Sequence, residues 1–536
     1  MKMSQVMKMK YCLMVLAALV GLVACDKFLD VDPDNRTEVN DIGEVDALLG
    51  SAYSENDYLV ISELMSDNVD DFGLTAFNST SRFFDQVFAW EDVTESNNES
   101  PERVWGSNYL AIGTANLALQ ALDKLGGPSD PALRESYAEA YLCRAYGHFN
   151  LVNLFCMPYN KRTSKTDLGV PYVTVPETEF NPVYERGTVE QVYQAIEKDL
   201  EAGLAWVGDS RYDVPKYHFN TQAAYAFATR FYLYYEKYDK AIECAKKVLG
   251  SDPTSVLRDY AAIQAMPSAV TAGKEYVSSS SPSNLLLMTA YSILSRFFAN
   301  YSSYNRYSHG SYLAATEGIA ANNIWGSNTY YINKTHTYSG SMDKVIFWHV
   351  PYLFEYTDPV AGTGYNRAIY PAFTTDECLL NRAEANVMLG NYDAACDDLN
   401  MWLHNYTTST MVLTPDAVQK FYDGVKYSTW KDGTIRKHMH RDDIDEEGSV
   451  QESMLQLVLG VKRIETMGYG QRWFDLKRYG IKVYRRQVDN TYTPFRVTDS
   501  LEVYNPAAGT EADPRWAVQI PYKVVIAGMA PNPRNK

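Results

Sequence analysis

The sequence has no excess of basic residues. Its 536 residues include 49 Lys and Arg against 66 Asp and Glu, which gives a formal net charge of -17 at pH 7. Binding to nucleic acid needs a basic surface that releases counterions from the phosphates, so we expect no nucleic-acid partner. The hydrophobic fraction is 46%, which argues against a disordered chain and predicts a globular core.

Cysteine is scarce, and no two cysteines are spaced as CxxC. Beyond Cys12 and Cys25, the chain contains Cys143, Cys156, Cys244, Cys378 and Cys396. An odd number argues against a fully paired disulfide framework. Because most of the five occur within apolar helical patterns, we interpret them as small core residues.

Long apolar runs are absent after residue 24. Three lysines precede an apolar run from residue 11 to 24, and about 14 residues are too few to span a bilayer, which takes about 20. The run ends in LVAC, which resembles the lipobox of bacterial lipoproteins. We therefore expect residues 1–24 to be a cleaved signal peptide and Cys25 to carry the lipid anchor. The alternatives are an ordinary signal peptide with a chance cysteine, or a short buried helix.

The mature chain divides into a short acidic segment and one long domain. Residues 25–45 contain several aspartates and an early proline, so we predict a solvated tether that does not lie on anionic lipid. Residues 46–536 are predicted to form a single α-helical domain with a loop-rich insertion at about 251–370.

Helical periodicity dominates that domain. Apolar spacing predicts helices over about 102–125 and 130–155, and Thr188 is the expected N-cap of a third. Two later units, 220–250 and 374–406, each join an Ala-rich helix to a second helix through a Tyr-Asp step. They resemble the tetratricopeptide helix-turn-helix. The predicted fold class is all-α, with paired helices as a scaffold and long irregular aromatic-rich loops.

Aromatic residues are concentrated in the insertion. The chain has 42 Tyr against 20 Phe and 9 Trp, and residues 291–338 contain 11 aromatics but only four charged residues. The remaining residues there are largely Ser, Asn and Gly, which favour loops. Sugar rings stack their C–H faces on aromatic rings while polar groups orient their hydroxyls, so this insertion is a candidate glycan-binding region.

Several short motifs occur in an order typical of one family. They are CDKFLDVDP from Cys25, ELMSDNVDD over 63–71, WxxxYxxIxxAN over 105–116, Arg144-Ala145-Tyr146, Arg186-Gly187-Thr188-Val189, Arg382-Ala383-Glu384-Ala385, VKRIE over 461–465 and GxRWFDLKR over 470–478. Together they resemble the SusD/RagB family, surface lipoproteins with which Bacteroidota capture nutrients. The RWFDLKR segment itself is interpreted as structural, with buried rings and ion pairs.

The resemblance implies a fold, a location and a partner. The fold would be α-helical, built on tetratricopeptide-like pairs, with loops forming the ligand face. The protein would be lipid-anchored in the outer membrane and face the cell exterior. Its partner would be a SusC-like TonB-dependent transporter, over which the lipoprotein closes as a lid.

The candidate ligand-binding residues fall in two regions. Near the N-terminus they are Asp67, Asn68, Phe83, Phe84 and Trp90, and in the insertion they are Tyr304, Tyr307, Tyr312, Trp325, Tyr330 and Tyr331. About half of the insertion aromatics are expected in the core. Trp325, Tyr330 and Tyr331 are flanked by Asn, Gly and Ser, so we expect them to be the least core-like, whereas Trp105 is assigned to the core.

Catalytic and metal-binding signatures are weak. No P-loop, dinucleotide fingerprint, HExxH or GxSxG is present. His438 and His440 with the acids that follow could hold a metal, but we interpret them as a solvated acidic loop. Asp67, Asp70 and Asp71 could suggest the carboxylate pair of a glycosidase, and we interpret them as polar binding or capping groups. We therefore predict non-catalytic capture of an oligosaccharide or polysaccharide without a cofactor. A RagB-like peptide-binding protein and a surface glycoside hydrolase are the alternatives.

Overall fold

The computed structural model describes residues 39–73, 81–177, 182, 184–298, 306–327, 336–338 and 343–534, with backbone only at 336–338. Cys25, Tyr304, Tyr330 and Tyr331 lie outside the described residues, as does the predicted signal peptide. Within the described ranges, no helix is both long and apolar enough to cross a membrane.

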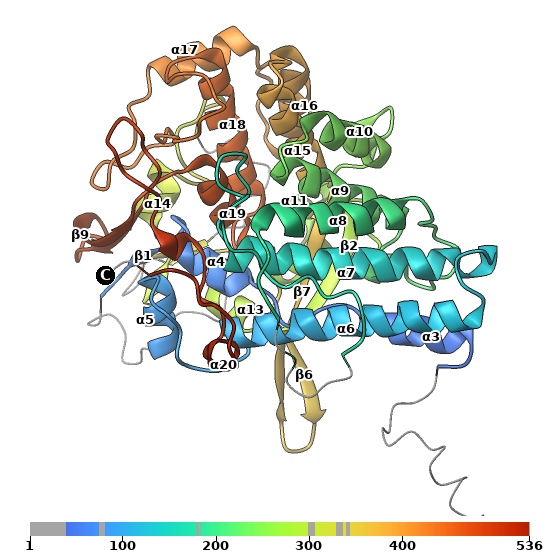
Figure 1. The fold of residues 1–536 in the computed structure, drawn as a ribbon. Helices are drawn as coiled ribbons and strands as arrows, with labels where there is room; N and C mark the ends of the chain where they lie inside the picture. Colours follow the sequence, from blue (N-terminus) through green and yellow to red (C-terminus); the bar gives the residue numbers. More distant parts are fainter. Residues whose placement is uncertain are drawn as a thin grey trace, which may run out of the picture.

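A row of long helices forms one side of the body, as predicted. These are α6 (Pro101–Leu125), α7 (Arg134–Phe155) and α8 (Val189–Leu204), and they stack side by side (Figure 1). The Thr188 hydroxyl accepts a hydrogen bond from the Gln191 backbone N–H while the Gln191 side chain accepts from the Thr188 N–H. This capping box fixes the start of α8, so the predicted N-cap is confirmed.

The two predicted helix pairs continue the row. The first is α9 (Thr221–Tyr234) with α10 (Tyr238–Leu249), and the second is α15 (Thr375–Met388) with α16 (Tyr392–Tyr406). Although they are far apart in sequence, α10 packs directly on α15. Ala245 of α10 and Ala383 of α15 are fully buried, and small residues allow close approach of paired helices. The predicted tetratricopeptide-like scaffold is confirmed.

The C-terminal part extends this scaffold. Helix α17 (Pro415–Asp423) packs on α18 (Val450–Glu465), and α18 also packs on α15. Helix α19 (Gln471–Tyr479) contains the RWFDLKR segment, whose residues are all buried. The shorter helices are α3 (Ile42–Leu49), α4 (Leu59–Met65), α5 (Arg82–Phe88), α11 (Tyr260–Ala265), α12 (Ala269–Tyr276), α13 (Leu294–Phe298), α14 (Ser311–Thr316) and α20 (Tyr522–Ile526).

The insertion contains strands that we did not predict. An antiparallel sheet has the order β2-β7-β6, with β2 (Asn284–Tyr291), β6 (Leu353–Asp358) and β7 (Thr363–Thr374). Most of β2 is buried on both faces, so its sequence shows no apolar alternation to reveal it as a strand. The expectation that loops fill this region is wrong for these segments.

A second sheet joins segments from three parts of the chain. Its order is β3-β1-β8-β9, with β1 (Asp70–Asp71), β3 (Tyr307–Ser308), β8 (Val483–Val488) and β9 (Pro494–Leu501). Strands β4 (His336–Tyr338) and β5 (Lys344–Ile346) form a further antiparallel pair. The four-stranded sheet β3-β1-β8-β9 thus brings the N-terminal ELMSDNVDD segment next to the insertion and the C-terminal region.

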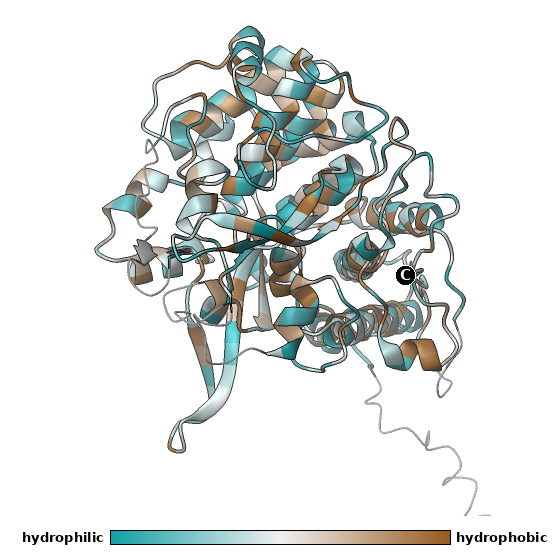
Figure 2. Ribbon diagram, turned by 90° about the vertical axis from the view of Figure 1, so that its left-hand side faces the viewer, coloured by the Kyte–Doolittle hydropathy of each residue, from teal (hydrophilic) through white to brown (hydrophobic). Residues whose placement is uncertain are grey.

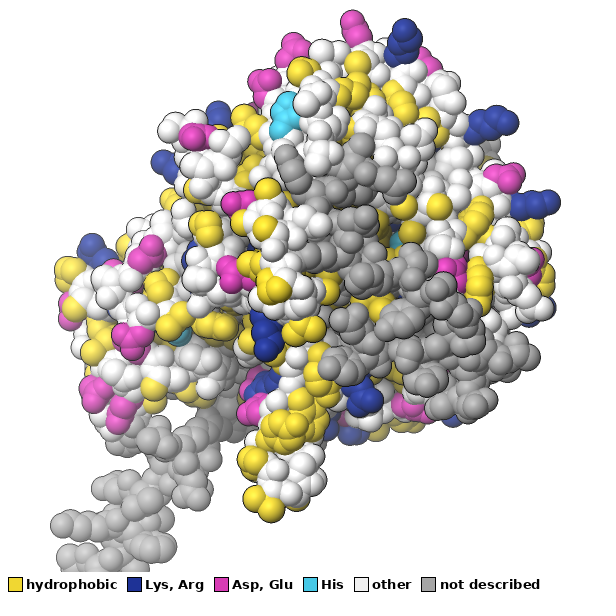
Figure 3. All heavy atoms as spheres, turned by 180° about the vertical axis from the view of Figure 1, so that it is seen from behind, with side chains coloured by type: hydrophobic (Ala, Val, Ile, Leu, Met, Phe, Trp, Pro, Cys, Tyr) yellow, Lys and Arg dark blue, Asp and Glu magenta, His cyan; other side chains and the backbone are white. Residues whose placement is uncertain are grey.

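The β6–β7 hairpin projects from the body, as Figures 1 and 2 show from two sides. Figure 3 shows hydrophobic side chains along it. Tyr356 and Tyr365 are exposed, and Val360 near the tip is 99% exposed. The hairpin is therefore the most prominent apolar projection of the described chain.

The predicted tether is shorter than we expected. Asp41 accepts a hydrogen bond from the Glu44 backbone N–H and so caps α3, which starts at Ile42. Val45 and Leu49 are fully buried, and α3 packs on α6 and α7. Residues 42–45 therefore form the first turn of α3, and the buried Val45 holds that turn to the folded domain.

All five cysteines of the described chain are buried and free of disulfide bonds. Burial raises the pKa of the Cys378 thiol to about 12, which keeps it protonated and unreactive at neutral pH. The interpretation of these cysteines as small core residues is confirmed.

Candidate functional site

Several segments converge on one side of the scaffold. We call this region the junction, and it comprises residues 70–72, 82–88, 294–298, 306–309 and 343–347. The Phe72 N–H donates to the Arg306 carbonyl at 2.9 Å, and the Phe347 N–H donates to the Phe298 carbonyl at 3.0 Å. The first bond joins the N-terminal segment to the insertion, and the second joins two segments of the insertion to each other.

Aromatic rings from both predicted ligand regions meet in the junction. Phe83 and Phe84 lie 5.3 Å apart, measured between ring centroids, and Phe84 lies 5.0 Å from Phe297. Tyr307 stacks on Phe88 at 4.1 Å. Phe83, Phe88, Phe297 and Tyr307 are buried, whereas Phe84 is half-buried. Phe84 is therefore the predicted residue of this group whose ring remains partly accessible.

Charged groups hold Tyr307 in place against Phe88. The Tyr307 hydroxyl donates to Asp85 Oδ1 at 2.5 Å, and Arg306 donates from Nε and Nη2 to the Asp71 carboxylate at 2.6 and 2.7 Å. A further contact of 3.3 Å joins Arg306 Nη1 to Asp85. The Asp85 side chain is 38% exposed and that of Arg306 is 20% exposed, so the junction presents a carboxylate next to a guanidinium.

Asp85 and Arg306 were missed by the sequence reasoning. Each directly follows or precedes an aromatic residue that was selected, in the strings RFFD and NRY. That adjacency was the available signal. A phenyl ring can stack on a sugar, and carboxylate and guanidinium groups bind hydroxyls.

The side chains of Asp67 and Asn68 accept hydrogen bonds from arginine side chains. Arg472 donates from Nε and Nη2 to the two Asp67 carboxylate oxygens, both at 2.9 Å. The Asn68 amide donates to Glu63 Oε1 at 2.8 Å and accepts from Arg463 Nε at 2.7 Å. Burial alone would raise the pKa of Asp67, but Arg463 and Arg472 hold it well below its usual range. These two side chains fasten α18 and α19 to the N-terminal segment.

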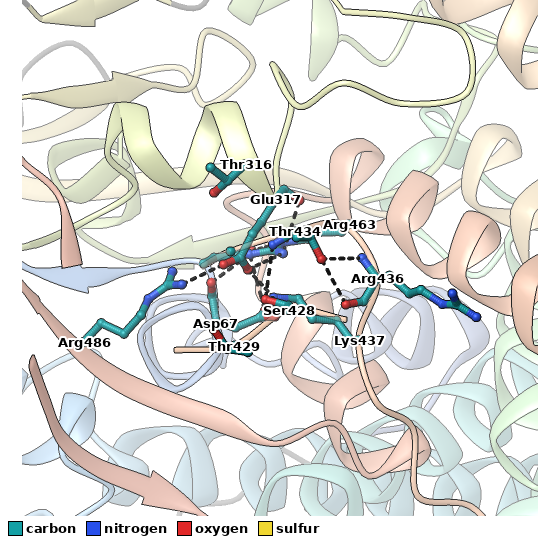
Figure 4. A network of polar contacts seen from close by, with 12 residues as sticks. Asp67, Thr316, Glu317, Ser428, Thr429, Thr434, Arg436, Lys437, Arg463 and Arg486 are labelled. Carbon is teal, nitrogen blue, oxygen red and sulfur yellow. Dashed lines mark hydrogen bonds and ion pairs between the residues drawn. The ribbon is translucent and has the colours of Figure 1, made fainter. Parts of the chain in front are cut away.

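Glu317 lies at the centre of the adjoining charge network (Figure 4). It accepts from Arg486 Nη1 at 2.6 Å, from Arg463 Nη1 at 3.4 Å and from Lys437 Nζ. Burial would raise its pKa, but Arg486, Lys437 and Arg463 lower it to about 2, so it stays ionised. A narrow crevice of about 50 Å³ opens beside Glu317 and Lys437, which is room for little more than water.

Trp90 and Tyr312 are also engaged in structural contacts. The Trp90 indole N–H donates to the Met65 carbonyl at 3.0 Å, and the Arg485 guanidinium lies 3.7 Å from its ring centroid. The Tyr312 hydroxyl donates to the Lys431 carbonyl at 2.7 Å and accepts from the Gly433 N–H at 2.9 Å. The buried Trp90 therefore supports the fold, and Tyr312 anchors the loop at 431–433.

The expectation that Trp325 is among the least core-like aromatics is wrong. A tight turn pairs Asn323 with Gly326 and directs the Trp325 ring inward. The residue is 6% exposed, and its ring centroid lies 5.8 Å from that of Trp402 on α16. Neighbouring Asn and Gly residues therefore marked a turn and not an exposed ring. Trp105 is buried, as predicted.

The carboxylates considered for catalysis are each paired with an arginine. Asp67 pairs with Arg472, Asp70 with Arg486 through Nε at 2.8 Å, and Asp71 with Arg306. A glycosidase dyad needs one protonated acid and one available carboxylate. These pairs do not provide that arrangement.

The His438 and His440 region lacks a metal-binding geometry. His438 Nδ1 lies 2.6 Å from Glu447 Oε1, whereas His440 Nδ1 contacts the Gly480 carbonyl at 2.9 Å. Throughout the described part of the chain, no group of three or more His, Cys, Asp or Glu side chains is arranged to hold a metal ion.

The fold and the candidate site together define a class of protein. It is a helical-repeat protein whose candidate ligand-binding groups meet where an insertion joins the scaffold. Known families agree with this architecture. Residues 27–233 match a SusD-like family model described as "Starch-binding associating with outer membrane", and residues 294–523 match the SusD family model. The chain belongs to the SusD/RagB family.

Individual relatives are distant. A SusD-like protein P2 from Formosa agariphila is 27% identical over 158 residues, which covers 29% of this chain and 28% of that protein. The chain thus aligns with under a third of that curated relative. A proposed sugar-binding protein from Bacteroides vulgatus has a similar structure, with a TM-score of 0.63, 19% identity and coverage of 93% of this chain and 99% of the other. A SusD-like carbohydrate-binding protein from the same species gives a TM-score of 0.61, 15% identity and coverage of 91% and 97%. These structural likenesses show the fold.

Proposed function

We propose that this protein is a cell-surface lipoprotein that binds a glycan and delivers it to a SusC-like TonB-dependent outer-membrane transporter. It acts as the lid of that transporter and does not transform its ligand. The observation that carries the proposal is the SusD-family match in both halves of the chain, over 27–233 and 294–523. The starch-binding and outer-membrane description of the first model supports a glycan ligand and a surface location.

The junction is the proposed ligand face. Phe84 supplies a partly accessible ring, and Asp85 and Arg306 supply paired charged groups in the same region. The predicted residues Tyr304, Tyr330 and Tyr331 remain candidates for the same face. The ion pairs and hydrogen bonds of Arg306 hold it in one orientation, so little side-chain entropy is lost when a ligand binds.

Anchoring and attachment follow from the N-terminal segment. Cys25 is the proposed lipid attachment site, and the residues before α3 are the tether. Helix α3 starts at Ile42, 17 positions after Cys25. An extended chain of that length reaches about 60 Å, which allows the lid to swing while the lipid stays in the membrane.

The proposal is tested by affinity gel electrophoresis of the mature chain without its lipidated cysteine, residues 26–536, in gels that contain starch or another candidate polysaccharide. We expect at least one polysaccharide to retard the protein. Phe84→Ala should weaken that affinity about tenfold, because a well-stacked ring contributes about 1.4 kcal/mol. The matched control is Phe421→Ala, which removes another half-buried phenyl ring, on α17.

Each outcome has a defined meaning. Binding of peptides without retardation by any polysaccharide would support the RagB-like alternative and refute glycan capture. Retardation that Phe84→Ala and Phe421→Ala change equally would refute the role of the junction. Release of shorter sugars during the experiment would contradict the non-catalytic role.

A further inference from the structure

A larger cavity lies outside the junction. It has a volume of about 310 Å³, at the lower end of the range of small-molecule sites. We call it the α7 cleft, because its first wall is the segment that follows α7. Its lining comes from residues 157–168, 440–442, 477–480, 503–517 and 532–533, and none of the junction residues is among them.

Aromatic rings form part of the cleft. Tyr159, Tyr504 and Trp516 all line it. Trp516 is 3% exposed and stacks on Trp473 with 4.9 Å between ring centroids, so it forms a rigid wall. The Arg162 guanidinium lies 3.5 Å from the Tyr504 ring centroid, so it stacks on one face of that ring and holds it in place.

Polar groups of both kinds line the same space. Arg162 Nε lies 3.3 Å from Asp442 Oδ2, and both side chains are partly exposed. His440 Nδ1 contacts the Gly480 carbonyl at 2.9 Å. Because a carbonyl can only accept, Nδ1 carries the hydrogen and Nε2 of the neutral ring is an acceptor. Asp167 and Glu511 add carboxylates. The cleft therefore offers hydrogen-bond donors and acceptors, and the hydroxyl groups of a sugar ring require both.

The cleft does not favour an anion. Lys477 lines it, but its Nζ donates to the Asn153 carbonyl at 2.6 Å and to the Cys156 carbonyl at 2.8 Å, at the end of α7. Burial lowers the pKa of Lys477 to about 7, so its amine is only partly protonated at neutral pH. Two further arginines, Arg441 and Arg478, also line the cleft. Arg162 is offset by Asp442, Arg441 by Asp443 and Glu236, and Arg478 by Glu384 and Asp475. A neutral, hydroxyl-rich ligand matches this balance better than a phosphate or a carboxylate.

The walls are fixed before any ligand arrives. The Asn160 N–H donates to Ser164 Oγ at 2.8 Å, and the Arg162 N–H donates to Asn160 Oδ1 at 2.8 Å. On the opposite side, the buried Asn532 amide donates to the Phe155 carbonyl at 2.8 Å and to the Val518 carbonyl at 2.7 Å. Such pre-organisation reduces the entropy cost of binding.

We propose that the α7 cleft is a second carbohydrate site, which takes one or two rings of a neutral glycan between Tyr504 and Trp516. This inference rests on the proposed glycan-binding function, which it extends to a second place on the molecule. Two sites on one protein would hold a long polysaccharide more firmly than either site alone, provided the chain can span both.

The test is saturation-transfer NMR on the mature chain with the methyl glycosides of glucose, galactose, mannose and xylose. We expect at least one to bind. Its Kd should rise about tenfold in Tyr504→Ala, which removes the stacking ring, and should also rise in Arg162→Ala. Phe421→Ala, whose ring lies on α17 and outside the cleft, should leave this Kd unchanged, and unaltered melting temperatures will confirm that the variants fold.

Two results would overturn the inference. One is the absence of binding by all four glycosides, and the other is a Kd that neither Tyr504→Ala nor Arg162→Ala changes. If polysaccharide gels still retard the protein, the glycan-binding function stands and the second site fails alone. If retardation is absent as well, both proposals fail together.

Discussion

Glu317→Gln is expected to destabilise the protein strongly, because it removes one charge from a buried network. Glu317 is 1% exposed at its side chain and faces Arg486, Arg463 and Lys437. Gln keeps the shape but leaves three cationic side chains without their shared carboxylate. Removing one partner of a buried ion pair typically costs about 3 to 5 kcal/mol.

The expected change in melting temperature follows from the size of the domain. Unfolding entropy is about 2.1 cal/mol/K per residue, so a domain of about 500 residues gives about 1 kcal/mol/K. A loss of about 3 to 5 kcal/mol therefore lowers Tm by about 3 to 5 °C, measured by differential scanning calorimetry at pH 7. Since the pKa of Glu317 is lowered to about 2 from 4.5, its contribution should be present above pH 4.5 and lost as pH falls toward 2.

The control is Glu355→Gln on the projecting hairpin. Glu355 pairs with Arg367 at 2.5 Å, but its side chain is 50% exposed, and surface pairs contribute about 0 to 1 kcal/mol. Its Tm should change by less than about 1 °C. If Glu317→Gln lowered Tm no more than Glu355→Gln does, the account of the network as a buried clamp would be refuted.

Three further predictions concern other parts of the chain. Burial raises the pKa of Glu99 to about 8, so the stability that its protonated form provides is present below about pH 4.5 and declines as pH rises toward 8. Glu99→Gln should therefore flatten the decline of Tm between pH 5 and 8.5. An unchanged slope would contradict this. Gly470 has φ +71° and an added Cβ would overlap the Ser62 hydroxyl, whereas Gly448 has φ +86° in open space. In urea denaturation, Gly470→Ala should lower the free energy of unfolding by about 2 kcal/mol or more, and Gly448→Ala by about 1 kcal/mol. Equal losses would argue against the close contact. Cys25→Ala should release the protein from the membrane fraction in immunoblots, and retention without lipid would show that the partner holds it.

Local sequence patterns were sufficient to predict the scaffold. Helices α6, α7 and α8 follow from apolar spacing and from the Thr188 cap, because both act within a few residues. Local patterns could not predict that α10 packs on α15, because the insertion separates the two helices in the sequence and must fold outside the row of helices. Strand β2 was missed because a strand buried on both faces has no alternating pattern.

The candidate site was predicted only in part. Phe84 was selected for its aromatic ring, and it does lie beside Phe297 of the insertion. The pairing of Asp67 with Arg472 joins residues about 400 positions apart, so no local pattern could reveal that the carboxylate is already occupied. Trp325 shows the same limit, because its burial depends on Trp402 in a distant helix.

Glycan capture at the junction can be measured by calorimetric titration of the mature chain with the polysaccharide that retards it in gels. We expect measurable binding that Phe84→Ala weakens about tenfold and Phe421→Ala leaves unchanged. Absence of heat with every polysaccharide, or equal affinity in both variants, would contradict it.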